Sequence, residues 1–354
     1  SVDAGFNWLN KTTTDNNCEA NTNELVFSIL ALGANNYNVN RGIDELISRQ
    51  SGDGSWNSNV IETSLAILVL KDNNKNYDVA LNWLLERQIK ALNEGNWLVE
   101  IRTQQGGSCN LGLTDSNPVT FEVNSSGVSC DFDGNGDGFG DWIDLERCAG
   151  FTLDKVEEVK VNCNNLGNAD IYLIYKLGNN YYLIDEKLNS NSANLILHNA
   201  YFGDYDSTAY ASWVLKEIGM VNDVYTIPYL KSNLRQNNVL DRAFIYMLTN
   251  DRVYSDWLVR RQSNFTGSWD GNLYNTAFAT MSLGKNSAQG SKAINWIKGE
   301  QNTNNESRGY GSWNNELRDT DFVLWSVFSD KKVTGTVPGG NFRSNYNSSD
   351  ISGN

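Results

Sequence analysis

One short pattern recurs along this chain and limits the folds that the chain can adopt. An amphipathic helix with a Gln near its end is followed by a polar turn and then by Gly-x-Trp. The clear copies end in Gly54-Ser-Trp56, Gly95-Asn-Trp97, Gly267-Ser-Trp269 and Gly311-Ser-Trp313. Repeats of this kind are typical of stacked helical hairpins, because one hairpin cannot bury its own apolar face. The sequence therefore predicts a core built largely from repeated helix pairs.

Within each predicted pair, the second helix is more apolar than the first. Residues 61–70 are apolar nearly all round, as in a helix that is buried on every side. The first helices are amphipathic, so they are expected to lie outside. The pattern predicts twelve helices in two layers, with 25–32, 61–70, 206–216, 239–248, 275–283 and 319–328 in the inner layer.

Residues between 98 and 203 follow a different pattern. Strand-like alternation appears at 98–102, 119–123, 156–161, 171–177 and 181–184, and Leu177-Gly-Asn-Asn180 is a good hairpin turn. We expect a small antiparallel β domain inserted within the third helical pair. The predicted domains are a first helical part (1–97), the β insertion (98–203), a second helical part (204–333) and a polar tail or linker (334–354).

The repeat resembles the QW motif of the terpenoid cyclase and protein prenyltransferase superfamily. Gln50, Gly54 and Trp56 match the spacing of that motif, and the other copies have longer loops. The resemblance covers the helical parts, about two thirds of the chain. It implies a mainly α fold, an (α/α)6 toroid of six helical hairpins with the β domain as an insertion. The Gln and Trp are structural in that family, so the resemblance assigns no catalytic residue.

One acidic, glycine-rich loop has the pattern of a calcium site. Counted from Asp133, it resembles the calcium loop of EF-hands, and more closely the dockerin type, which closes with Asp instead of Glu. Gly138 would allow the sharp turn that such a loop needs. The alternative is an acidic turn without metal. We predict one bound Ca²⁺, ligated by the side chains of Asp133, Asn135, Asp137, Asp141 and Asp144 and by the carbonyl of Phe139.

Two acidic pairs stand at the starts of predicted inner helices, Asp204 with Asp206 and Asp319 with Asp321. They can be compared with the Asp-x-Asp-Asp motif of class II terpene cyclases, but the final Asp is missing from both. Acidic residues also favour and cap a helix N-terminus, and this is the preferred interpretation. The four residues are therefore only weak candidates for catalysis, and no catalytic residue is assigned.

Composition restricts the partners and the compartment. The net charge of −14 disfavours nucleic acid and anionic membrane surfaces, and no apolar run is long enough to span a membrane. The start at Ser1, without Met or a signal peptide, is what a processed secreted protein would show. Four of the five Cys crowd into one segment, which predicts two disulfides and leaves Cys18 as a buried thiol. Sequons that would allow N-glycosylation stand at Asn10, Asn124, Asn264, Asn305 and Asn347.

These observations favour a secreted or cell-surface protein that is structural or recognises a partner, is not catalytic, and is stabilised by Ca²⁺. Self-association into a surface layer or filament, a surface partner and a glycan are the expected kinds of contact, made through the β domain and the tail after Lys332. The alternative is an extracellular enzyme with its active site in the helical cavity, either a polysaccharide lyase or hydrolase or a terpene cyclase-like enzyme. An open cavity with converging acids would favour the enzyme, and a filled one would favour the recognition protein.

Overall fold

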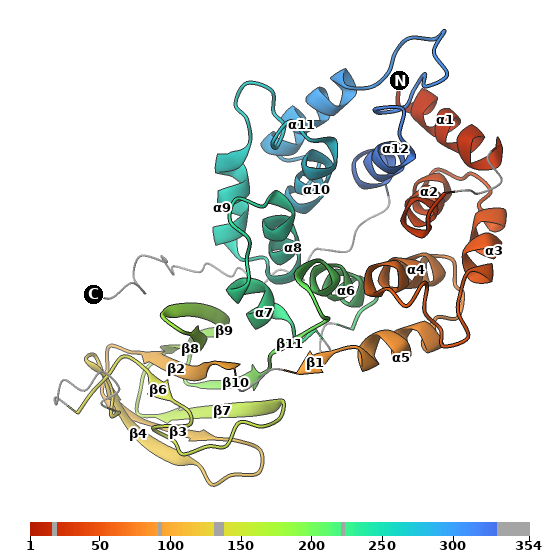
Figure 1. The fold of residues 1–354 in the computed structure, drawn as a ribbon. Helices are drawn as coiled ribbons and strands as arrows, with labels where there is room; N and C mark the ends of the chain where they lie inside the picture. The colour runs from red at the N-terminus through yellow and green to blue at the C-terminus, as the bar shows by residue number, and fades with distance from the viewer. Residues whose placement is uncertain (16–19, 91–93, 131–137, 221–223, 331–354) are drawn as a thin grey trace. The chain divides into compact units, whose positions relative to one another are not determined.

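The computed structural model describes residues 1–15, 20–90, 94–130, 138–220 and 224–330 (Figure 1). The chain divides into two compact units. Among the described residues, the helical unit comprises 1–88, 202–224 and 234–330. The β unit comprises 89–201 and 225–233. Each unit is described by itself.

Six inner helices of the helical unit pack side by side in sequence order, and the last returns to the first, so that they close a ring. They are α2 (Thr22–Ala34), α4 (Val60–Asp72), α6 (Tyr205–Glu217), α8 (Val239–Thr249), α10 (Leu273–Leu283) and α12 (Leu317–Val323), which continues as a π-helical turn (Leu324–Phe328). The described outer helices are α1 (Val2–Asp15), α3 (Asn40–Ser48), α5 (Asp78–Glu86), α9 (Arg252–Arg261) and α11 (Ala288–Gly299).

The two sets of helices differ in burial, as their composition requires. In α4 every residue from Thr63 to Leu70 is buried, whereas α3 buries Ile43 and Leu46 and exposes its opposite face. Most inner helices also begin at a side-chain cap, worth about 0.5–2 kcal/mol each. The capping side chains accept a hydrogen bond from a backbone N–H near the helix start, and they belong to Asn21, Asn59, Asp204, Asn238 and Asn272.

The repeated Gln and Trp fasten the end of an outer helix to the start of the next inner helix. Trp56 Nε1 donates to the Leu46 carbonyl at 2.7 Å, and the Trp56 backbone N–H donates to Thr63 Oγ1 at 3.0 Å. Gln50 Nε2 donates to the Gly54 carbonyl at 2.9 Å, which closes the turn. The same pair of Trp bonds joins Trp269 to Leu258 and Thr276, and Trp313 to Ile297 and Thr320.

The copy that ends at Trp97 has a different role. Trp97 lies in strand β2 (Asn96–Arg102) of the β unit, where its ring packs against Tyr175 with the ring centroids 5.0 Å apart. In the helical unit, Phe202 takes over the backbone contact, because its N–H donates to Thr208 Oγ1 at 2.8 Å. One sequence pattern therefore serves two different local structures.

The β unit contains three antiparallel sheets in the described residues. The five-stranded sheet has the order β10 (Ser192–Leu197), β7 (Glu157–Asn164), β3 (Gly107–Gly112), β4 (Val119–Asn124) and β5 (Gly127–Val128). The four-stranded sheet has the order β6 (Ile143–Asp144), β2, β8 (Ala169–Leu177) and β9 (Asn180–Ser190). Strands β1 (Ile89–Lys90) and β11 (Ala200–Tyr201) form the third sheet. Helix α7 (Ile227–Ser232) packs on β9 and β11.

Alternating side chains of both larger sheets meet in one apolar core, which includes Val99, Leu111, Val161 and Leu173. The prediction of two disulfides is confirmed. Cys109 is bonded to Cys163 across the paired strands β3 and β7, and Cys130 is bonded to Cys148. Such bonds fit a secreted protein or another oxidising environment.

The predicted fold class, a mainly α (α/α)6 toroid with a small β insertion, is wrong, and so is the family resemblance that implied it. The chain is mixed α/β, with 43% of the described residues in helices and 21% in strands. Its eleven described strands include a five-stranded half-barrel. The physical reason is that the Gln and Gly-x-Trp repeat encodes a local helix connection, while residues 98–203 carry a complete core of their own. Helix α7 lies within the predicted second helical part (204–333), but it packs on strands instead.

Candidate functional site

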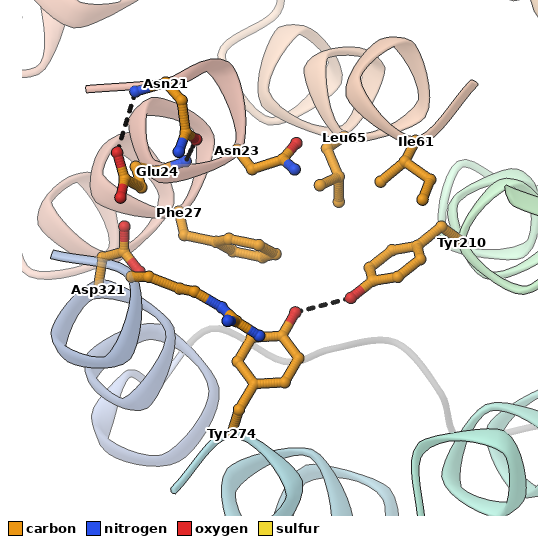
Figure 2. A pocket seen from close by; sticks show the side chains of 10 residues that line it. Asn21, Asn23, Glu24, Phe27, Ile61, Leu65, Tyr210, Tyr274 and Asp321 are labelled. Atoms are coloured by element: carbon orange, nitrogen blue, oxygen red, sulfur yellow. Dashed lines mark hydrogen bonds between the residues drawn. The ribbon is translucent and has the colours of Figure 1, made fainter. Parts of the chain in front are cut away.

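A cavity of about 210 Å³ lies among the first turns of the inner helices (Figure 2). Most of its side chains stand two or six residues after a helix cap, and these two positions share one face of a helix. Asn23 and Phe27 come from α2, Ile61 and Leu65 from α4, Tyr210 from α6, Tyr274 from α10 and Arg318 from α12. Asn21, Glu24 and Asp321 complete the lining. The repeat therefore builds the site by bringing equivalent positions of successive helices together.

Aromatic side chains fill the ring of helices beside this pocket. Phe278 packs on Phe322 with the ring centroids 5.1 Å apart, and Trp213 packs on Trp325 at 5.8 Å. Trp213, Phe278 and Phe322 are at most 1% exposed. These buried rings pack beside the pocket, whose lining comes from the amino-terminal turns of the inner helices.

Asp321 is the unusual residue of the pocket, because its carboxyl group is wholly buried. Ser28 Oγ donates to Asp321 Oδ2 at a long 3.4 Å, and Asp321 Oδ1 has no hydrogen-bond partner among the residues that the structure describes. Burial raises the pKa of Asp321 well above its ordinary value, and this effect outweighs the backbone N–H of Phe322 and the hydroxyl of Ser28, which lower the pKa. The net effect favours the neutral carboxyl, which can donate as well as accept a hydrogen bond.

Two tyrosines and an arginine also line the pocket, and the arginine, Arg318, comes from the same helix as Asp321. The hydroxyls of Tyr210 and Tyr274 are hydrogen-bonded at 2.7 Å, as Figure 2 shows. Burial raises the pKa of both, so they remain neutral. The Arg318 guanidinium lies over the Tyr274 ring, 4.7 Å from its centroid. Together with the helix N-termini, Arg318 supplies positive potential to this end of the unit.

Glu24 is held at the mouth of α2. It forms a capping box with Asn21, in which Asn21 N–H donates to Glu24 Oε2 at 3.0 Å and Glu24 N–H donates to Asn21 Oδ1 at 2.9 Å (Figure 2). The pocket thus combines apolar walls, hydrogen-bond donors at one end and a single buried acid. This arrangement suits a small ligand with an apolar body and a carbonyl or carboxylate end.

The four acidic residues singled out in the sequence are not brought together. Asp204 caps α6, since its Oδ1 accepts the Ser207 N–H at 2.8 Å. Asp206 is exposed and pairs with Arg235, with 2.6 Å between Oδ1 and Nη2. Asp319 accepts a hydrogen bond from Asn314 Nδ2 at 2.7 Å. Asp321 alone faces the pocket, and capping does not explain it, because α12 begins after Glu316.

The predicted calcium loop is only partly described. Asp133, Asn135 and Asp137 lie outside the described residues. Asp141 is exposed, and Asp144 is buried in β6, where its Oδ1 accepts the N–H groups of Glu146 at 3.0 Å and Arg147 at 2.9 Å. Phe139 lies in the described part of the loop. No group of three His, Cys, Asp or Glu able to hold a metal exists within the described ranges, so the calcium site stays a prediction.

Sequence reasoning missed Phe27, Tyr210, Tyr274 and Arg318. The signal was present in the spacing from each cap, but it becomes readable only when the caps are placed correctly.

Comparisons with protein-family models, with curated proteins and with solved structures found no match. Among the described residues, no helix is both long and apolar enough to span a membrane.

Proposed function

We propose that this chain is an extracellular or cell-surface recognition protein whose helical unit binds a small molecule in the pocket around Asp321. The observation that carries the proposal is the buried atom Asp321 Oδ1, which lies beside the cavity and accepts no hydrogen bond from the part of the chain that the structure describes. Leaving such an atom unpaired costs about 1–3 kcal/mol. A ligand with a hydrogen-bond acceptor could accept a hydrogen bond from the neutral carboxyl group of Asp321 and so recover that free energy.

Binding is favoured over catalysis by the make-up of the pocket. General acid–base chemistry requires a group that receives a proton as well as one that gives it. Apart from Asp321, the carboxylate in the lining belongs to Glu24, which is occupied by its capping box. Aromatic rings also pack beside the pocket, where Tyr274 and Phe278 each stack on Phe322, and the pocket itself holds only about 210 Å³.

An extracellular enzyme is the second candidate, and the environment of Asp321 is the observation that favours it. A carboxyl group with a raised pKa in a cavity has the property of a general acid. In that case Asp321 would transfer its proton to a bound molecule, which a recognition protein does not require.

The experiment is a screen of small aliphatic and aromatic carboxylic acids and amides against the intact protein, read by thermal shift and calorimetry. Compounds that bind are then tested on Asp321→Asn, which keeps a donor, and Asp321→Leu, which removes it. We expect binding to survive in Asp321→Asn and to weaken about tenfold or more in Asp321→Leu. Asp206→Asn, on the exposed side of α6, is the matched control.

Three outcomes contradict the proposal. Equal binding by wild type and Asp321→Leu would show that the carboxyl is not part of a binding site, as would the absence of any bound compound. Conversion of a bound compound by wild type, lost in Asp321→Asn while binding remains, would establish the enzyme instead.

Two further parts of the proposal concern the β unit. One Ca²⁺ bound by residues 133–144 would stabilise the β unit. The ligand spacing and the buried position of Asp144 support this proposal.

Self-association through a sheet edge is supported by β10, an edge strand of the five-stranded sheet that exposes Ile196. The tail 334–354 lies outside the described residues. Light scattering of the intact protein, of Ile196→Lys and of a protein lacking 334–354 tests assembly, which a monomer under all conditions would refute.

A further inference from the structure

A second cavity, of about 550 Å³, lies in the β unit and belongs to no site described so far. It opens where several strand ends meet, and it involves both larger sheets. Its volume lies within the range of small-molecule sites. We call this cavity the β-unit groove. Residues Glu100 to Gln104, from β2 and the loop after it, and Asn124 to Gly127, from the β4–β5 turn, form part of its lining. The rest of the lining is Asp141 and Trp142 before β6, Asn168 and Asp170 near the start of β8, and Asn189 near the end of β9.

The groove is rich in planar polar side chains. Carboxylates and amides of Gln104, Asn124, Asn168, Asp170 and Asn189 stand around it, and each amide offers a donor beside an acceptor. Gln104, Asn168 and Asn189 are exposed to solvent. Groups of this kind are suited to two neighbouring hydroxyls, because one oxygen and one N–H can contact both at once.

One aromatic side chain accompanies these polar groups. Trp142 stacks on Tyr181 with the ring centroids 4.9 Å apart and an interplanar angle of 26°. It packs against the small cluster of Leu98, Tyr172 and Ile174 on the four-stranded sheet. The indole is therefore fixed in place at the edge of the groove, where it provides the apolar surface on which the C–H face of a sugar ring can rest.

Other contacts hold the polar groups in place. Glu100 is 7% exposed and accepts from Arg102 Nε at 2.6 Å, and the Arg102 guanidinium lies 5.3 Å from the centre of the Tyr172 ring. Asp170 Oδ1 accepts the Asn189 N–H at 2.9 Å, which ties the ends of β8 and β9 together. A site whose side chains are already ordered loses less conformational entropy on binding.

We propose that the β-unit groove binds a neutral oligosaccharide. Glu100, Asp141 and Asp170 contribute negative formal charges to the lining, and Arg102 contributes a positive one. The net charge of the lining is therefore negative and repels sulfated or sialylated chains. Mixed donors and acceptors together with one fixed indole are what a polyhydroxylated ring requires.

The experiment uses the full-length protein on an array of oligosaccharides ending in glucose, galactose, mannose or N-acetylglucosamine, with sialylated and sulfated chains included. The best-bound neutral oligosaccharide is then titrated into wild type and variants by calorimetry. Trp142→Ala tests the stacking surface, and the double variant Gln104→Ala/Asn168→Ala tests exposed amides whose loss leaves the core intact. Phe265→Ala, an aromatic in the helical unit that is 98% exposed, is the control.

We expect neutral chains to bind, both test variants to weaken binding about tenfold or more, and the control to leave it unchanged. Because Asn124 is a sequon residue in the groove, the protein is deglycosylated before the titration. The proposal is overturned if no neutral oligosaccharide binds, if acidic chains bind in preference, or if both folded variants bind as wild type does. None of these results bears on the helical pocket, so the two sites are judged separately.

Discussion

The helical unit and the β unit place their polar binding groups in opposite ways. The pocket of the helical unit hides one unpaired carboxyl, Asp321, among aromatic side chains. The β-unit groove spreads many amides and carboxylates over exposed strand ends. The difference follows from how each unit is built: repeated helices direct equivalent positions inward, whereas antiparallel strands end in loops that face solvent. A buried site therefore selects its ligand by shape and by one hydrogen bond, whereas an exposed site selects its ligand by many hydrogen bonds.

Removing one buried Trp from each unit should give the largest effect and show whether the units are stabilised separately. Trp269 and Trp97 are both completely buried, so replacement of either by Ala should cost about 3–5 kcal/mol. Chemical denaturation measures the loss, and hydrogen exchange locates it. We expect lost protection in the helical unit for Trp269→Ala and in the β unit for Trp97→Ala. If both variants lost hydrogen-exchange protection equally in the two units, the units would not be stabilised separately.

Acid should weaken the β unit through His198. Burial lowers the pKa of His198 to about 4 from 6.5, so the unfolded chain takes up a proton that the folded chain rejects. The resulting stability is present above pH 6.5 and is lost as the pH falls towards 4, with a magnitude up to about 3 kcal/mol. His198→Gln should flatten the pH dependence of β-unit unfolding between these values. An unchanged slope in the variant would show that His198 is not the cause.

Calcium should stabilise the β unit by a somewhat smaller amount. A ligand present at a hundred times its dissociation constant adds about 2.7 kcal/mol. Asp137→Ala should therefore lower the melting temperature in calcium and have no effect in chelator. Asp115→Ala, an exposed Asp outside the loop, is the matched control. Equal effects of Asp137→Ala in both solutions would count against a bound ion.

The helical unit should respond to pH in the opposite sense. Because the pKa of Asp321 is raised above 3.8 in the folded state, its neutral form is stable at acid pH and its contribution is lost as the pH rises. Asp321→Asn should therefore stabilise the helical unit near neutral pH by about 1–3 kcal/mol, and by little near pH 4. Melting curves of both proteins across this range test the sign. A constant difference at all pH values would exclude titration of Asp321.

The sequence predicted local features better than the complete fold. The hairpin between β8 and β9, the disulfides and the alternation of burial along the helices depend on neighbouring residues or on periodicity. The class was wrong because the helical repeat was taken to define the fold and residues 98–203 were treated as a small insertion, although this segment and the Trp97 copy build a β core of their own. The Gln and Gly-x-Trp pattern determines only the connection between two helices. It does not show how long the segments between its copies are or what structure they form.

The pocket was harder to predict for a geometric reason. Asp319 and Asp321 are two residues apart, and two residues turn a helix by about 200°, so their side chains leave on nearly opposite faces. Asp319 bonds to Asn314 at the surface, while Asp321 enters the pocket. The sequence showed an acidic pair, but only the helix register separates the buried carboxyl from the exposed one. Tyr210 and Tyr274 meet across 64 positions, a distance that no local motif bridges.

The most direct test is the carboxyl spectrum of protein labelled with ¹³C at its Asp side chains. The resonance assigned to Asp321, by its absence from Asp321→Asn, should remain that of a protonated carboxyl at neutral pH. It should shift when a carboxylic acid or amide from the screen is added, while the resonance of Asp206 does not. If Asp321 titrates in the ordinary range of Asp and is unaffected by every compound that binds, the pocket is not a recognition site and the account fails.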